Sequence, residues 1–558
     1  MPDVSSDGLT WTFHLKTGLH YAPPMQNVEI VAGDVVRALE REARVGSGYS
    51  FYFDVIEGFD EYGAHTADSI SGLQTPDDHT LVVTLTTLVG DLGSRLALPG
   101  AAPIPPGAAD GHADYGRFLV ASGPYMFEGS QDLDFSEPPA DQTPVSGYVP
   151  WRSTTKSYTA GSVTLVRNPS WDPATDALRA AYVDRIEVSL GGYDVKDPST
   201  FQASDFTAGA EREFRKVIDG RLDLVLDTAP PARQLRAIRS QPLLASRLHV
   251  NEYAESIYIT MNLAVPPFDD IHVREAMNLA LDKATLRRRW LAWVAGKDIP
   301  ESTGGGDIAS HIAPNEMEGN LLLSWHPGWM DTSTGGDLVA ARAEMARSKY
   351  DRDSDGICDA AVCRNVQLAE TAVWPRPFDG VVRHDLSKIG IQVRIHRYSV
   401  DPASPDYIYA SHGPLIPAAR TPLMANGWFR DYPGGSAFFP ELMDSANLGS
   451  VHPVAFNDFS MLGASAGKLR QWRYPVRTVP GIDDRIRACS AVAGVAQQAC
   501  WAQLDQFLME RVVPWVPFLF QSVTIFTSSR VARYSFDQAT GVPALDQIAL
   551  TPAAIASS

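Results

Sequence analysis

An aromatic and an acidic side chain stand three residues apart in the segment NGWFRDYPGG, residues 426–435. The Tyr-Pro-Gly-Gly sequence at its end cannot continue a helix, so Trp428 and Asp431 are expected on or beside a loop. A carboxylate accepts a charge-assisted hydrogen bond from an ammonium group, and an indole ring offers a flat apolar wall. This pair is the first candidate for a binding site. Two alternatives stay open: Asp431 only pairs with a neighbouring arginine or caps a turn, and Trp428 is only a core residue.

A second group of residues suited to chemistry is the acidic segment DRDSDGICD, residues 351–359. Its glycine stands at position six of a calcium-type loop, but position twelve is Val362, so the bidentate glutamate of an EF-hand is missing. We expect either weak calcium binding that braces the loop or a solvated acidic turn, and no other cofactor. The carboxylates stand at loop positions one, three, five and nine: Asp351, Asp353, Asp355 and Asp359.

The four cysteines fall into two pairs that are close in sequence, Cys358 with Cys363 and Cys489 with Cys500. Such spacings can close small disulfide loops, which are typical of exported proteins. Four buried thiols are the alternative, because cytosolic proteins also keep a few cysteines as small hydrophobic residues. A zinc site at these cysteines is disfavoured, since no histidine lies near either pair in sequence.

The bulk composition argues against a nucleic-acid-binding protein and against a membrane-spanning protein. A chain of 558 residues with 44% hydrophobic residues is expected to form two or three domains. The 47 basic and 66 acidic residues give a net charge of −19 without a basic stripe, so nucleic acid is not an expected partner. The apolar segment VVPWVPFLF has 9 residues, well short of the roughly 20 that span a membrane. The first residues, MPDVSSDGLTWTFHL, show no basic and apolar regions of a secretion signal.

Strands and helices that would position these residues are mixed along the chain. Residues 9–15 alternate between apolar and polar, as in a half-buried strand, and Asp34 is expected to cap a helix that ends at Gly46. Further strands are expected at residues 80–87, 161–168 and 183–190, and a helix at 206–220.

The second half of the chain continues this mixture. Asp269 or Asp270 is expected to cap one long amphipathic helix over residues 273–296. Two helices over residues 483–513 and a strand over 514–529 follow. Such mixing indicates α/β or α+β domains.

Short motifs distributed over nearly the whole chain resemble those of one protein family. The motifs are DGLTWTFHLKTGLHY (7–21), VAGDVVRALER (31–41), SGPYMF (122–127), LVRNPSWDP (165–173), DGRLDLV (219–225), MNLAVPPFDDIHVREAMNLALDK (261–283), LSKIGIQVRI (386–395), GWFRDYPG (427–434) and VVPWVPF (512–518). With these motifs in this order and spacing, the chain resembles the peptide/nickel (oligopeptide/dipeptide-binding) family of ABC-transporter extracytoplasmic solute-binding proteins.

The resemblance implies an α/β fold of two lobes, the type II periplasmic-binding-protein fold, with an extra subdomain in lobe one. The N-terminal part of lobe one is expected to be missing from this chain. Hinges are expected near residues 252–258 and 513–518. The implied ranges are 1–160 for the extra subdomain, 161–255 for the main part of lobe one, 256–515 for lobe two and 516–558 for the C-terminal return to lobe one.

The resemblance also implies a function without catalysis: capture of a peptide or similar small polar solute between the lobes and delivery to a membrane permease. By the match, Asp431 would pair with the α-ammonium group of a peptide and Trp428 would wall a side-chain pocket. Tyr258 and Phe520 are weaker candidates for ligand contact. Family members commonly have an acidic residue and a proline after the anchoring aspartate, whereas this chain has Gly434–Gly435, so a looser loop is expected.

The implied protein is a monomer outside the cytoplasm, lipid-anchored in its full-length form. Two alternatives belong to other classes: a hydrolase with paired carboxylates between the lobes, and a truncated family member that binds nothing.

Overall fold

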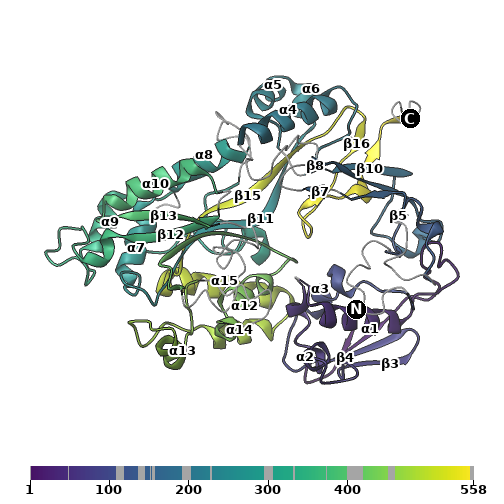
Figure 1. The fold of residues 1–558 in the computed structure, drawn as a ribbon, viewed down its shortest axis with the longest axis horizontal. Helices are drawn as coiled ribbons and strands as arrows, with labels where there is room; N and C mark the ends of the chain where they lie inside the picture. The colour runs from purple at the N-terminus through teal and green to yellow at the C-terminus, as the bar shows by residue number, and fades with distance from the viewer. Residues whose placement is uncertain are drawn as a thin grey trace. The chain divides into compact units, whose positions relative to one another are not determined.

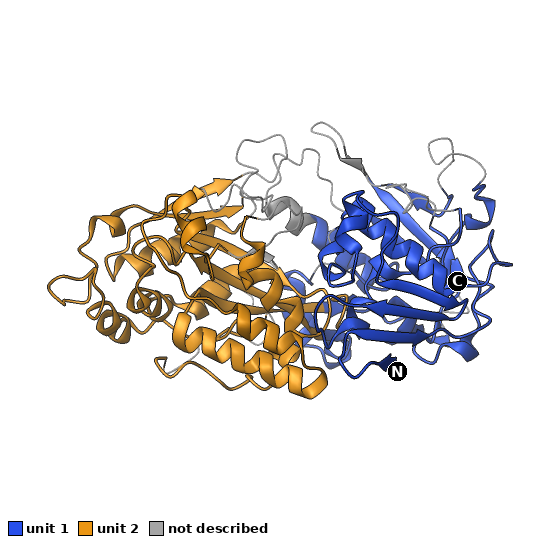
Figure 2. Cartoon of the chain, turned by 90° about the horizontal axis from the view of Figure 1, so that it is seen from below, with its two compact units in different colours: residues 1–249, 525–537, 542–558 blue, residues 250–524, 538–541 orange. Residues whose placement is uncertain are grey.

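Two compact units make up the chain (Figure 2): residues 1–249, 525–537 and 542–558 form unit 1, and residues 250–524 and 538–541 form unit 2. The chain changes unit inside strand β11 (Leu248–Met261) and again inside strand β15 (Trp515–Phe526). The expected hinge regions lie in or beside these two strands, and the separate subdomain over residues 1–160 stays a prediction. The computed structural model describes the chain apart from residues 1, 48, 108–118, 136–144, 151, 154–157, 191–202, 227–228, 295–305, 331–333, 372–373, 399–418, 450–458 and 553–558.

Unit 1 contains two four-stranded sheets whose strands pair antiparallel. The expected strands near residues 9–15, 80–87, 161–168 and 183–190 are all present. The first sheet has the order β1 (Asp3–Val4), β2 (Thr10–His14), β4 (Thr80–Thr84) and β3 (Leu73–Asp77). The second has the order β10 (Arg185–Leu190), β9 (Gly161–Arg167) and β5 (Tyr125–Phe127), with β6 (Tyr148–Val149) also paired to β9.

Helix α1 (Ala32–Val45) shows how local sequence sets an element's ends. Asp34 caps this helix as expected, from the third helical position: its carboxylate accepts from the backbone N–H of the N-cap residue Val31 at 3.1 Å. An acidic side chain at this place satisfies a free N–H and complements the helix dipole. The helix ends as expected at Gly46, whose φ of 60° suits glycine.

The remaining part of unit 1 packs helices against the end of β15. Phe214 of α4 (Ala203–Ile218) and Phe526 of β15 lie 5.2 Å apart between ring centroids in a buried apolar cluster. The helix expected over residues 206–220 is therefore confirmed. The other elements are α2 (Phe59–Gly63), α3 (Leu92–Arg95), α5 (Ala232–Arg239), α6 (Pro242–Ala245), β7 (Arg152–Ser153), β8 (Tyr158–Thr159), β16 (Val531–Arg533), β17 (Phe536–Asp537), β18 (Val542–Pro543) and β19 (Ala549–Leu550).

Unit 2 is organised by a mixed five-stranded sheet with the order β13-β12-β14-β11-β15. Strand β12 (Val366–Thr371) runs parallel to both β13 (Val393–Tyr398) and β14 (Leu423–Phe429), whereas β14 runs antiparallel to β11. The first half of strand β15 is buried, as expected from its run of apolar residues.

Helices lie to both sides of this sheet in Figure 1, with α8 and α10 above the strands in the view and α12, α14 and α15 below. Phe378 of α10 packs on Phe518 of β15, and Phe439 of α12 stacks on Trp501 of α15. In each pair the ring centroids are 5.5 Å apart. The helices of unit 2 include α7 (Ile271–Ala280), α8 (Lys283–Val294), α9 (Leu338–Met345), α10 (Arg376–Ser387), α12 (Phe439–Met443), α13 (Ala466–Gln471), α14 (Asp483–Ser490) and α15 (Gly494–Phe507).

The single long helix expected over residues 273–296 is wrong, because the chain forms α7 and α8 with a break at Leu281. The side chain of Asp282 accepts from the backbone N–H of Thr285 at 2.8 Å and so starts a new helix. Gly335 packs closely on this break: a Cβ added to Gly335 would lie only 2.4 Å from the Leu281 carbonyl oxygen. The start of α7 follows the sequence, since Asp270 accepts from His272 N–H at 3.0 Å.

Both expected cysteine pairs are disulfide-bonded in unit 2, Cys358 with Cys363 and Cys489 with Cys500. The second disulfide links α14 to α15. Within the described part of the chain, no helix is long and apolar enough to cross a membrane.

Candidate ligand-binding site

The segment with Trp428 and Asp431 begins at the end of an interior strand of unit 2. Trp428 lies near the end of β14, where it faces Ser256 of β11 in the antiparallel register. Strand β14 pairs with β12 only through Leu423 and Met424, at the start of β14. The sheet thus carries Trp428 to the end of β14 and releases the chain into the turn that contains Asp431.

The indole of Trp428 is held in one orientation by a hydrogen bond. Its Nε1–H donates to the carbonyl oxygen of Ala437 at 2.9 Å, and the ring is half-buried. Ala437 ends a short 3-10 helix, η11 (Gly435–Ala437), just after the glycine pair. A ring fixed in this way loses little rotamer freedom when a ligand packs against it.

Asp431 is half-buried and follows a residue that is firmly anchored. Arg430 is 2% exposed; its guanidinium donates to the backbone carbonyl of Gln538, and its backbone N–H donates to Ala254 at 3.3 Å. These contacts fix the backbone directly before Asp431, so the Asp431 side chain is attached to a rigid part of the chain.

The glycine pair after Asp431 supports close packing in this turn. A Cβ on Gly435 would lie 2.5 Å from the Trp501 ring of α15, so only glycine lets the backbone reach that ring. The structure thus gives Gly435 a packing role in place of the expected loosening.

Tyr258 and Phe520, the weaker candidates, are both covered by residues of unit 2. Tyr258 is 2% exposed and stacks on Trp515, with centroids 3.6 Å apart and planes 3° from parallel. Phe520 is 6% exposed and lies 4.8 Å from the His311 ring. Their burial favours a role in packing, and their part in ligand contact stays an untested prediction.

Glu255 is a charged residue near this segment that the sequence patterns did not single out. It faces Phe429 in the β11–β14 register, and the side-chain amide of Gln521 donates to it. Burial raises the pKa of Glu255 to about 7. The only signal in the sequence is one acidic residue inside the strand segment YAESIYITM.

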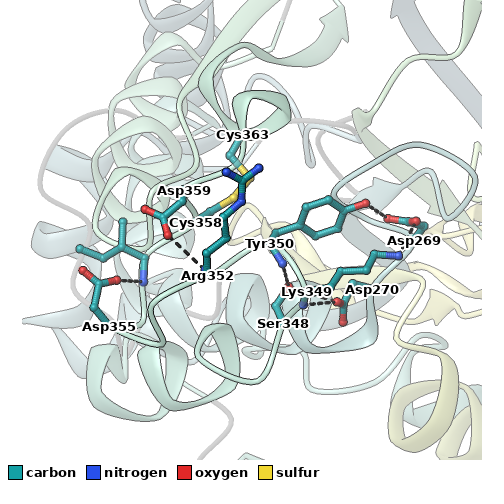
Figure 3. The surroundings of a disulfide bond; sticks show 11 residues. Asp269, Asp270, Ser348, Lys349, Tyr350, Arg352, Asp355, Cys358, Asp359 and Cys363 are labelled. Atoms are coloured by element: carbon teal, nitrogen blue, oxygen red, sulfur yellow. Dashed lines mark hydrogen bonds and ion pairs between the residues drawn. A yellow bond between two sulfur atoms is a disulfide. The ribbon is translucent and has the colours of Figure 1, made fainter.

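The acidic loop over residues 351–359 folds around its own carboxylates (Figure 3). Asp351 is 6% exposed and accepts from the backbone N–H groups of Ser354 at 2.8 Å and Gly356 at 2.7 Å. Asp355 accepts from Ile357 N–H at 2.8 Å, and Asp359 accepts from Arg352 N–H at 3.1 Å. The loop is thus ordered by backbone hydrogen bonds, and calcium binding there stays a prediction.

Contacts on the helix side hold this loop in place (Figure 3). Tyr350 donates its hydroxyl to Asp269 at 2.6 Å, and the ammonium of Lys349 pairs with the same carboxylate at 2.8 Å. The loop is closed at its other end by the disulfide between Cys358 and Cys363. The sequence analysis singled out the loop carboxylates and the cysteine pair, but not the connection of Tyr350 and Lys349 to Asp269.

Three groups of metal-ligating side chains occur among the described residues. One is Asp351 with Asp353 and Asp359; the nearby Asp355 carboxylate raises the pKa of Asp353. The other two, which sequence spacing could not reveal, are His272 with Glu275 and Glu344, and His311 with Glu318 and Asp505.

The chain forms two units of mixed helices and strands and passes between them within β11 and within β15. This organisation is typical of one class of proteins, the two-lobed α/β binding proteins of type II. Within it, the chain belongs to the bacterial extracellular solute-binding proteins, family 5: the sequence pattern of the family's "Middle" part matches residues 2–450. The resemblance inferred from the motifs, and the type II periplasmic-binding-protein fold that it implies, are therefore confirmed.

Relatives of known name are distant in sequence. The periplasmic oligopeptide-binding protein OppA of Escherichia coli (strain K12) is 20% identical over 461 residues, which cover 80% of this chain and 69% of OppA. The glutathione-binding protein GsiB of Pectobacterium atrosepticum is 25% identical over 287 residues, which cover 51% of this chain and 43% of GsiB.

Solved structures share the fold along the chain. The clavulanic acid biosynthesis oligopeptide binding protein 2 aligns with a TM-score of 0.70 at 22% identity, over 99% of this chain and 85% of that one. OppA of Haemophilus influenzae, in complex with the peptide RPPGFSPFR, aligns with a TM-score of 0.60 at 16% identity, over 99% and 89%. At these identities the likeness establishes the fold alone.

Proposed function

We propose that this chain captures short peptides with a free ammonium group and delivers them to the membrane permease of an ABC importer. The segment with Trp428 and Asp431 carries the proposal: a fixed indole and a half-buried carboxylate follow one interior strand of a solute-binding fold. The names of the relatives support this choice, since several are oligopeptide-binding proteins.

In the proposed mode, Asp431 accepts charge-assisted hydrogen bonds from the peptide's ammonium group and Trp428 packs against its first side chain. Such a bond contributes about 1.5–3 kcal/mol, more than a neutral one. Backbone groups recognise an extended peptide whatever its side chains, so many sequences are accepted. The two units are expected to close around the peptide, and the permease is expected to recognise the closed state.

The first test is thermal denaturation of the full chain with a pool of short peptides and with the same pool N-acetylated. A ligand at 100 times its Kd adds about 2.7 kcal/mol to the stability of the state that binds it. We expect the free pool to raise Tm and the acetylated pool to have little effect, because acetylation removes the ammonium charge.

A substitution locates the anchor. Asp431→Asn keeps the shape of the side chain and removes its charge, so we expect Kd for free peptides to rise about 10- to 100-fold. Asp444→Asn is the matched control: Asp444 lies outside the 426–435 segment, just after α12, and the amide oxygen of asparagine can still accept from the backbone N–H of Ala446, as the Asp444 carboxylate does at 2.8 Å.

Three outcomes would argue against the proposal. Failure of both pools to raise Tm contradicts a peptide ligand, and equal shifts contradict an ammonium anchor. Cleaved peptides in mass spectra of the incubated pool would favour the hydrolase alternative. Delivery to a permease is tested separately by uptake of labelled peptide in cells with and without the chain.

A further inference from the structure

A closed cluster of His311, Glu318 and Asp505 lies in the interior of unit 2. His311 precedes the 3-10 helix η8 (Asn315–Glu318), Glu318 is the last residue of η8, and Asp505 lies on α15. The side chains of His311 and Asp505 are 2% and 0% exposed, and Glu318 is 0% exposed. Their nitrogen and oxygen atoms lie within 4.8 Å of one another, although α15 is far from η8 in sequence.

Polar atoms of this cluster lack the partners that buried groups normally have. Both carboxylate oxygens of Glu318 and the Nδ1 atom of His311 are buried without a hydrogen bond. Burial raises the pKa of Glu318 well above its usual value, and the Asp505 carboxylate raises it further. Protonation would remove the charge of Glu318 but would still leave the carboxyl group without a partner, and an unpaired buried polar group is strongly unfavourable.

Hydrogen bonds from neighbouring groups orient the His311 and Asp505 side chains, as such bonds commonly do for metal ligands. His311 Nε2 lies 3.0 Å from the amide oxygen of Asn315, which can only accept, so Nε2 carries a hydrogen, and in the neutral imidazole Nδ1 keeps its lone pair. Asp505 is fixed by two backbone N–H groups: that of Ile312 donates to Oδ1 at 2.9 Å and to Oδ2 at 3.1 Å, and that of Ala313 donates to Oδ2 at 2.9 Å. Outer contacts of this kind set the tautomer and direction of metal-binding side chains.

The spacing and the charge fit one small divalent ion. Nδ1 of His311 and Oδ2 of Asp505 are 3.4 Å apart. Two ligands of a tetrahedral zinc ion, each at about 2.0–2.1 Å from the metal, lie about 3.3 Å from each other. Two carboxylates would balance its double charge in a site without water access.

We propose that His311, Glu318 and Asp505 form a structural binding site for one divalent transition-metal ion of the zinc class. One imidazole nitrogen with carboxylate oxygens suits Zn²⁺ and its neighbours, whereas Ca²⁺ takes six to eight oxygen ligands. The ion would tie η8 to α15. Trp501, one turn earlier on α15, lies against Gly435, so the ion would brace the helix beneath the Trp428–Asp431 turn.

The other two groups of metal-ligating residues do not share this feature. His272 Nδ1 is hydrogen-bonded to Glu344 at 2.9 Å, and the oxygens of Asp351 accept from the backbone. In contrast to His311 Nδ1 and the two Glu318 oxygens, no ligating atom of these two groups is buried without a hydrogen bond, which makes the two groups controls for the test.

The test uses the full chain without a histidine tag, stripped with a chelator and then titrated with Co²⁺ and Zn²⁺. Co²⁺ held by few ligands absorbs visible light more strongly than hydrated Co²⁺, so the spectrum reports the site directly. We expect one equivalent of Co²⁺ to give this spectrum, Zn²⁺ to displace it, and excess Zn²⁺ to raise Tm by about 5 °C. Glu318→Gln is expected to abolish the spectrum and the shift, and Glu344→Gln, the same change in the His272 group, is expected to keep both.

The proposal is overturned if the wild-type chain gives neither spectrum nor shift, if Glu318→Gln retains them, or if Glu344→Gln loses them. Should Glu318→Gln fail to fold, His311→Asn with His272→Asn as its control decides the same question.

Discussion

At the scale of single residues, Gly435 positions the candidate site through the absence of a side chain. Gly435→Ala would place a methyl group 2.5 Å from the Trp501 ring. We expect this to lower the free energy of unfolding by about 1–3 kcal/mol and to weaken peptide binding, because the turn after Asp431 must move. Gly380→Ala is the control, since α10 leaves open space there and alanine favours a helix by up to about 1 kcal/mol. Equal effects of the two changes in urea denaturation would contradict this role.

Glu255 gives a prediction with a defined pH window. Its pKa rises from 4.5 to about 7 on folding because of burial. The folded state therefore binds this proton more tightly than the unfolded state, and the contribution of Glu255 to stability falls as pH rises from 4.5 to 7. Above pH 7 the charged carboxylate destabilises the fold by about 3 kcal/mol.

Glu255→Gln removes this charge, so the variant should be more stable than the wild type at pH 8 and about equally stable at pH 4.5. Urea denaturation at both pH values measures the difference, and Glu252→Gln, an exposed neighbour on the same strand, should show none. A gain that is the same at both pH values would show that packing, and not ionisation, is responsible.

At the scale of elements, the acidic loop over residues 351–359 joins a helix to a disulfide. The Asp355 carboxylate raises the pKa of Asp353, so a cation beside them would relieve their repulsion. We propose weak calcium binding here and expect millimolar Ca²⁺, but not Mg²⁺, to raise Tm by a few degrees. Asp353→Asn should remove the effect, and Asp68→Asn, an exposed aspartate of unit 1, should leave it unchanged. A Ca²⁺ effect that survives Asp353→Asn would place the ion elsewhere.

At the scale of the whole molecule, the net charge of −19 sets the behaviour in solution. Self-repulsion destabilises a compact state and is screened by salt, with a Debye length of about 30 Å at 0.01 M and 8 Å at 0.15 M. We expect Tm to rise as the ionic strength is raised from 0.01 M to 0.15 M. A neutral sugar at equal osmolarity is the control for effects of added solute. A fall in Tm would mean that surface ion pairs outweigh the repulsion. The same charge supports the expectations of a monomer and of no nucleic-acid partner, which light scattering and DNA retention would test.

The sequence by itself determined the features that depend on neighbouring residues. Alternation over residues 9–15 encodes a strand because side-chain direction has a period of two, and Asp270 starts α7 because a short polar side chain can cap a free N–H. The order of local motifs likewise identified the family. The cysteine spacings left thiols and disulfides both open, and the structure shows disulfides.

Only the tertiary structure decided the features that join distant segments. The approach of Gly335 accompanies the break between α7 and α8, Trp515 covers Tyr258, and α15 brings Asp505 to His311 and Glu318. Local preferences differ by less than about 1 kcal/mol per residue, so contacts made across the fold can override or combine them. Such contacts depend on which surfaces meet when the chain is packed, and no short stretch of sequence records that.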